Sequence, residues 1–115
     1  MPQREKSSPV DRLFGALANP TRRDILGLLL DGPQTVNAIA ERFDMARPSV
    51  SEHLRVLREA GLVSETRLGR FRQIEIAPGP LRELHDWMTP YERFWRGRMR
   101  DLHDVLDRDA SEEGR

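Results

Sequence analysis

The sequence predicts a mainly α-helical fold that carries one small β-hairpin. Through about the first 60 residues, apolar side chains recur at the three- and four-residue spacing of helices. Over residues 63–76 the pattern becomes strand-like, because Ile74 and Ile76 alternate with polar neighbours and Gly69 permits a tight bend. A chain of 115 residues buries only about two-thirds of its unfolded surface, so dimer formation would add burial.

Two short helices are predicted at the start of the domain, which we place at residues 10–108 after a flexible arm at residues 1–9. The first helix covers residues 10–17. The second begins where Asn19 suits the N-cap position and Pro20 suits the first turn. It extends to about residue 30, where an Asp-Gly-Pro sequence ends it.

A helix-turn-helix is predicted next. Thr35 suits the N-cap of a short third helix, and a turn at residues 44–46 separates that helix from a fourth. The fourth helix has apolar residues on one side, and its other side carries Pro48, Glu52, Arg55 and Glu59, flanked by Ser51. Gly61 suits the left-handed position that ends this helix, and a basic hairpin, or wing, follows at residues 63–76. This order predicts a winged helix-turn-helix that holds DNA.

The fourth helix lacks a good cap at its start. Ala46 occupies the N-cap position, and alanine there is less favourable than serine by about 1 kcal/mol. We expect Asp44 to take over part of the capping role, or the first turn to be stabilised when DNA phosphates arrive.

Two further helical stretches are predicted at residues 81–88 and 90–108, separated by a capping box at Thr89-Pro90-Tyr91-Glu92. We expect residues 109–115 to form a disordered acidic tail. The last helix carries a broad apolar and aromatic stripe, although the first four helices already supply a core. We therefore predict a subunit interface formed by the first and last helices, with the residues Val10, Leu13, Phe14, Leu17, Tyr91, Phe94, Trp95, Met99, Leu102, Val105 and Leu106.

The charges are balanced overall but unevenly placed. Formal net charge is zero, so attraction of nucleic acid by bulk charge is not expected. Residues 42–72 hold seven arginines against four acids, whereas residues 101–113 hold six acids and one arginine. The absence of cysteine excludes disulfides and thiolate metal sites, and no apolar run approaches the roughly 20 residues of a membrane span. We expect a soluble cytoplasmic protein without a membrane partner.

No set of residues suited to catalysis is evident. Ser51 and His53 lie two residues apart on a helix and therefore diverge. The sequence has no glycine-rich phosphate loop and no carboxylate pair. We therefore predict a protein that is not an enzyme and whose partner is double-stranded DNA.

Arg55 is the strongest candidate for a base contact, because arginine can donate two hydrogen bonds to guanine O6 and N7. Glu52 either accepts from a cytosine amine or repels phosphate, and the sequence leaves both interpretations open. Helix N-termini suit phosphate binding, and the wing arginines are either phosphate contacts or solvated side chains of a turn. The predicted DNA-binding residues are Arg47, Ser49, Ser51, Glu52, Arg55, Arg67, Arg70, Arg72, Thr21, Arg22 and Thr35.

The order of these parts and the residues themselves resemble the ArsR family of bacterial winged-helix repressors. The resemblance covers residues 10–108 and rests on LFGALANPTRRDILGLL, FDMARPSVSEHLRVLREAGLV and the wing with its Gly-Arg turn. It implies a homodimer joined through the first and last helices. It also implies binding to an imperfect palindrome near a promoter, with transcription blocked until a signal weakens the complex.

The metal-binding residues of the family are only partly present in this sequence. Thr35 and Asn37 stand where the thiolate-type sensors have cysteines. The zinc-type sensors carry Asp-x-His on the last helix and a second histidine further on. Here Asp101 and His103 match the first half, with Asp104 as a further candidate ligand, but no histidine follows. We expect no metal or other cofactor, and a metal-responsive repressor that uses this partial site is the alternative.

A second alternative is an interaction module whose aromatic last helix binds another protein while its DNA face is unused. The arginines of the fourth helix and the wing argue against it. An unknown small-molecule or protein effector remains open.

Overall fold

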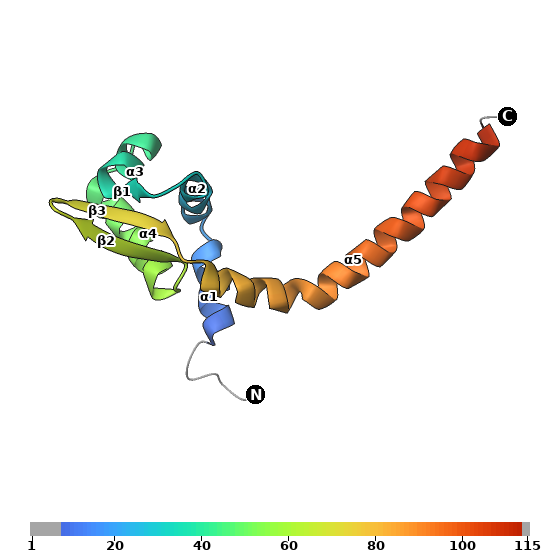
Figure 1. Cartoon of the computed structure of the whole chain (residues 1–115), viewed down its shortest axis with the longest axis horizontal. Coiled ribbons are helices and arrows are strands. Elements are labelled where there is room, and N and C mark those ends of the chain that lie inside the picture. The colour runs from blue at the N-terminus through green and yellow to red at the C-terminus, as the bar shows by residue number, and fades with distance from the viewer. Residues whose placement is uncertain (1–7, 114–115) are drawn as a thin grey trace. The chain divides into compact units, whose positions relative to one another are not determined.

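The computed structural model describes the backbone of residues 8–113 and the side chains of residues 8–110. Most of the predicted arm, residues 1–7, and the last two residues of the predicted tail lie outside this part. The chain divides into two compact units, Met1–Leu84 and His85–Arg115. The elements in chain order (Figure 1) are α1 (Pro9–Leu17), α2 (Pro20–Leu29), β1 (Gln34–Thr35), α3 (Val36–Phe43), α4 (Arg47–Glu59), β2 (Val63–Leu68), β3 (Phe71–Ile76) and α5 (Pro78–Glu113).

Side-chain caps begin the first three helices. Asn19 Oδ1 accepts a hydrogen bond from the Arg22 N–H at 3.1 Å, and Thr35 Oγ1 accepts one from Ala38 N–H at 3.1 Å. These bonds satisfy N–H groups that have no partner within the helix. Both predicted caps are confirmed. Ser8, which the sequence analysis placed in the arm, caps α1.

A small antiparallel sheet follows the helices, with strand order β1-β3-β2. The predicted hairpin is confirmed, and Gly69 at its turn has φ +61°. Strand β1 was not predicted from the sequence, and its two residues pair with Ile74 and Gln73 of β3. Gly61 has φ +79° at the end of α4, where glycine is favoured. Leu62 N–H then bonds back to Leu57 O at 2.9 Å, so β2 begins directly after the helix.

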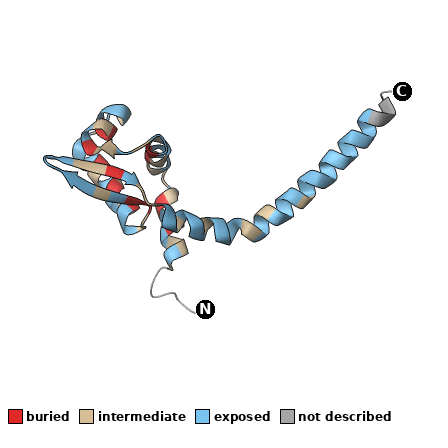
Figure 2. Ribbon diagram, in the orientation of Figure 1, coloured by how far each residue is buried: buried red, intermediate tan, exposed pale blue. Residues whose placement is uncertain are grey.

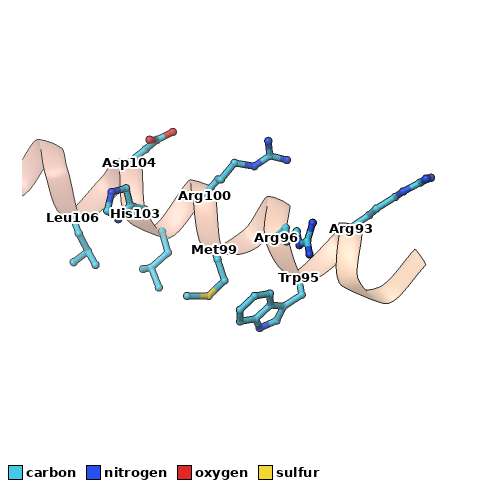
Figure 3. Close-up of a pocket in the computed structure, with 9 residues that line it drawn as sticks. Arg93, Trp95, Arg96, Met99, Arg100, His103, Asp104 and Leu106 are labelled. Atoms are coloured by element: carbon cyan, nitrogen blue, oxygen red, sulfur yellow. The ribbon is translucent and has the colours of Figure 1, made fainter. Parts of the chain in front are cut away.

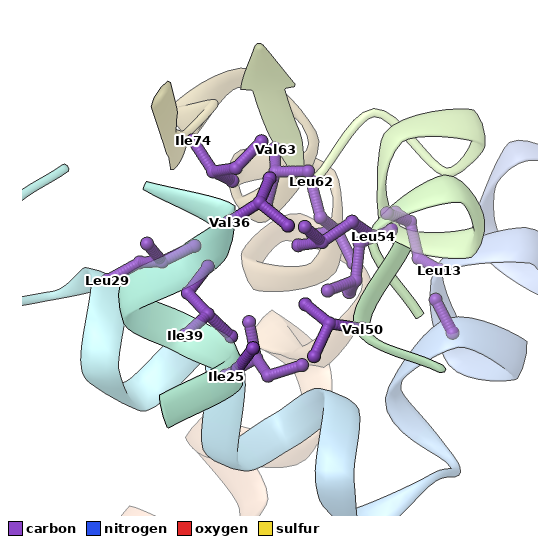
Figure 4. Packing of buried hydrophobic residues seen from close by; sticks show 13 residues of the cluster. Leu13, Ile25, Leu29, Val36, Ile39, Val50, Leu54, Leu62, Val63 and Ile74 are labelled. Carbon is purple, nitrogen blue, oxygen red and sulfur yellow. The ribbon is translucent and has the colours of Figure 1, made fainter. Parts of the chain in front are cut away.

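The core of the first unit lies between the four short helices and the sheet (Figure 4). The packing side of α4 is fully buried, since Val50, Leu54 and Leu57 are each 0% exposed. Leu13 of α1 is 1% exposed and belongs to this core, so its assignment to a subunit interface was wrong. The helical spacing that put Leu13 on the apolar side of α1 does not distinguish core from interface, and Leu13 faces the core.

The C-terminal segment is one continuous helix, which corrects two predictions. Pro90 lies inside α5 and does not begin a new helix, and the Thr89 hydroxyl donates to His85 O at 2.9 Å. A proline removes one backbone donor from a helix but does not always break it. Helix α5 also continues to Glu113, so residues 109–113 are helical here and not a disordered tail. No glycine or proline interrupts residues 98–113, which allows the helix to extend.

In the second unit, none of residues 85–110 is buried (Figure 2). Large apolar side chains are exposed along this part of α5, and Phe94 and Trp95 are 64% and 61% exposed. None of the helices in the described part of the chain is both long enough and apolar enough to cross a membrane.

Candidate nucleic-acid interface

Helix α4 presents a free face opposite its buried one, as the sequence predicted. Ser49, Glu52 and Arg55 are exposed on it, and Ser51 lies half-buried at its edge. His53 is also half-buried, and its Nδ1 atom is shielded from solvent without a hydrogen-bond partner in the described residues. Because the other face is anchored in the core, the exposed face is held rigidly at the surface.

The start of α4 has no side-chain cap. Ala46 is the N-cap residue and makes no side-chain hydrogen bond there. The expectation that Asp44 would help was wrong, because Asp44 adopts a left-handed conformation, φ 51°, at the C-cap of α3. Its backbone N–H bonds to the end of α3, so this residue ends one helix instead of beginning the next.

One shallow hollow brings together residues from three elements. The predicted residues Thr35, Arg47, Arg70 and Arg72 line it, from the start of α3, the start of α4 and the wing. Val36, Asn37 and Phe71 complete the lining. Arginines beside a helix N-terminus suit an anion, because the guanidinium groups and the helix dipole are both positive there. The hollow therefore has the chemistry of a phosphate-binding site.

The wing is tied to α4 by one carboxylate. Glu65 Oε1 accepts from Arg72 Nε at 2.9 Å and Nη2 at 2.6 Å, and Arg58 Nη1 of α4 lies 3.6 Å away. The hydrogen bond from Arg72 lowers the pKa of Glu65. Arg67 faces Arg72 across the hairpin and is exposed. This cluster was not predicted from the sequence, and it gives Arg72 a structural partner in addition to its place in the hollow.

Arg55 is held between two carboxylates on the free face of α4. Its Nε and Nη2 donate to Glu52 at 3.1 and 2.5 Å, and its Nη1 donates to Glu59 at 2.9 Å. The bond from Arg55 lowers the pKa of Glu52, and the two carboxylates raise the pKa of Arg55. The strongest candidate for a base contact is therefore already oriented in the free protein.

The predicted residues at the start of α2 do not line the hollow between α3, α4 and the wing. Arg22 Nε donates to Ala16 O at 2.7 Å, and its Nη2 donates to Gly15 O at 3.1 Å. The guanidinium satisfies carbonyl groups at the end of α1, where a positive charge is favourable. Arg22 therefore has a structural role that the prediction of a phosphate contact did not foresee. Thr21, beside it, does not line the hollow.

Along α5, polar and apolar side chains separate onto different sides of the helix. Figure 3 shows Trp95, Met99 and Leu106 on one side and Arg93, Arg100 and Asp104 on the other. A second hollow, beside the apolar side of this helix, is lined by α5 alone. It is therefore an open surface. Tyr91, Phe94, Leu102 and Val105 are also exposed, and on α1 Phe14 is exposed while Val10 and Leu17 are half-buried.

The partial metal motif on α5 engages a nearby carboxylate. His103 Nε2 lies 3.3 Å from Asp107 Oδ2, one turn further along the helix. Within the described residues of the single chain, no three histidine, cysteine or acidic side chains come together as ligands. Asp101, His103 and Asp104 are therefore not brought together as three ligands within the described single chain.

The chain is similar in sequence to known bacterial transcription regulators. A family model described as bacterial regulatory protein, arsR family, matches residues 19–65. The transcriptional repressor SdpR of Bacillus subtilis (strain 168) is 38% identical over 82 residues, which cover 71% of this chain and 91% of that protein. The chain belongs to the ArsR family.

Solved structures of ArsR-family proteins share the fold. The regulator RHA00566 matches with a TM-score of 0.70 and 36% identity, over 77% of this chain and 98% of that one. A second match is Mb0332 from Mycobacterium bovis, a homodimeric winged helix-turn-helix DNA-binding domain. It has a TM-score of 0.62 and 30% identity, over 81% of this chain and 90% of that one. This ArsR-family chain is a DNA-binding transcriptional regulator, and its matched relatives are named as regulators and not as enzymes.

Proposed function

We propose that the chain is a homodimeric repressor that reads an imperfect palindrome near a promoter, with α4 in the major groove and the wing on the flanking backbone. The observation that carries this proposal is the hollow where Thr35, Arg47, Arg70 and Arg72 converge beside the exposed face of α4. Phosphate contacts at the hollow fix the position of the helix, and side chains of the helix read the bases. Because its proposed partner is DNA, we propose that the protein acts in the cytoplasm of a bacterial cell.

The proposal divides the work between two arginines, and this division can be tested. Arg55→Ala should reduce the preference for the specific sequence by about 1–3 kcal/mol, because it removes a bidentate base contact. Arg70→Ala should weaken binding to every sequence alike and reduce the salt dependence by about one phosphate contact. Fluorescence anisotropy with the DNA upstream of the gene and with a shuffled duplex, at two salt concentrations, measures both effects.

The matched control is Arg82→Ala, which removes the same charge from an exposed position on α5. It should leave the preference unchanged. An equal loss of preference in the Arg55 and Arg70 variants would contradict the division of work.

The homodimer is proposed from the exposed side of α5. Tyr91, Trp95, Leu102 and Val105 are spaced by four, seven and three residues, as in the seam of two paired helices. Residues 93–100 carry four arginines and residues 101–109 carry four aspartates. An antiparallel pair of α5 helices would place the basic part of one against the acidic part of the other. The Mb0332 domain is described as homodimeric, which supports a homodimer but does not specify its interface.

A further inference from the structure

Glu52 and Glu59 flank Arg55 on one face of α4. They lie three residues before it and four residues after it, a spacing that brings side chains together on a helix. All three guanidinium nitrogens of Arg55 donate to these carboxylates, at distances of 2.5–3.1 Å. The three side chains, which we call the Arg55 clamp, are each between 45% and 63% exposed. The guanidinium is therefore held along the surface from both ends.

The clamp leaves part of Arg55 available. A guanidinium has five N–H donors, and three of them are used in the clamp. Two donors remain, which is the number required for a bidentate contact with guanine O6 and N7. A base contact thus does not require the clamp to open completely.

The clamp also changes the charge of the reading surface. Two carboxylates and one guanidinium give a net charge of about −1 at neutral pH, which repels DNA phosphates. An unclamped arginine at this position would instead be attracted to the phosphates of any sequence. The same pair of carboxylates therefore disfavours non-specific contacts.

We infer that Glu52 and Glu59 are positioning residues that set sequence specificity, by holding Arg55 in one arrangement with two donors free for a base and by withholding it from phosphates. This inference rests on the proposed function, because it requires that α4 reads base pairs. It also distinguishes between the two interpretations of Glu52 that the sequence left open. Glu52 acts through Arg55 and through its charge, and Glu59, which was not among the predicted DNA-binding residues, acts with it.

The test is the double variant Glu52→Gln/Glu59→Gln, measured by fluorescence anisotropy on the upstream duplex and a shuffled duplex. Binding to the shuffled duplex should become tighter, and the ratio of the two affinities should fall about tenfold. The salt dependence on the shuffled duplex should steepen by about one phosphate contact as Arg55 reaches the backbone. Glutamine keeps the side-chain size on an exposed surface, so thermal unfolding should match the wild type.

The matched control is Glu41→Gln, the same chemical change at an exposed position of α3. It should leave the affinity ratio and the salt dependence unchanged. If the double variant keeps the wild-type ratio and salt dependence, or if Glu41→Gln changes them equally, the inference is overturned. A wild-type protein that binds both duplexes equally would instead overturn the proposed function, and the inference with it.

Discussion

Glu65 connects the wing to the helix that it follows. Its carboxylate accepts two hydrogen bonds from Arg72 of β3 and lies near Arg58 of α4. It is 24% exposed on its side chain, so water screens these charges less than at the fully exposed positions. One titratable group therefore contributes to the position of the wing, together with the core residues of its two strands.

The Glu65 carboxylate should make the free energy of unfolding depend on pH. The folded protein has a Glu65 pKa below the ordinary 4.5, so the carboxylate stabilises the fold above that pH. The stabilisation is lost as the pH falls through the lowered folded pKa. Glu65→Gln should therefore reduce the free energy of unfolding by about 1 kcal/mol near pH 7, and by much less near pH 2. Urea unfolding of both proteins at the two pH values measures this difference.

The control is Glu75→Gln, at an exposed position of β3. It should have little effect at either pH. A Glu65 variant with the same deficit at both pH values would show that the ion pairs are not the cause.

At the residue scale, the sequence predicted which side chains are exposed better than it predicted their hydrogen-bond partners. The helical period alone decides that Arg55 lies opposite Leu54 and Leu57, and this prediction is confirmed. The contact of Arg72 with Glu65 depends on the register of two strands, which the helical period does not contain. The position of Arg22 against the end of α1 likewise depends on how two helices meet.

At the scale of elements, caps and glycines were predicted correctly where the signal is local. Asn19, Thr35, Gly61 and Gly69 have the predicted roles. Strand β1 was missed because two residues are too few to show an alternating pattern. Pro90 was predicted to begin a helix, but the surrounding residues continue the helix through it. Local signals do not decide between a helix start and a tolerated interior proline.

Helix α5 gives a prediction about assembly. Trp95→Asp places a charge in the middle of the exposed apolar side, so it should convert a dimer into a monomer without disturbing the buried core. Sedimentation velocity at micromolar concentration measures the change. Thr66→Asp introduces the same residue at an exposed position of β2, outside the proposed interface, and should remain dimeric. A wild-type chain that sediments as a monomer would contradict the proposed interface.

At the scale of the whole molecule, the buried residues and the exposed apolar residues have different functions. The core of the first unit fixes α4 and the wing, whereas large apolar side chains of α5 among residues 85–110 are exposed. The fold class was predictable because period and turn residues determine it. The assembly was less predictable, because an apolar stripe does not specify whether it is covered by the core or by a partner. Leu13 illustrates this, since it was assigned to an interface but lies in the core.

The most direct test of the central claim is the binding of the wild-type chain to DNA, measured by fluorescence anisotropy with the upstream duplex and a shuffled duplex at two salt concentrations. We expect much tighter binding to the upstream duplex, and we expect both affinities to fall as salt increases. Equal affinity for the two duplexes would contradict sequence reading by α4 and would favour a protein-interaction module instead.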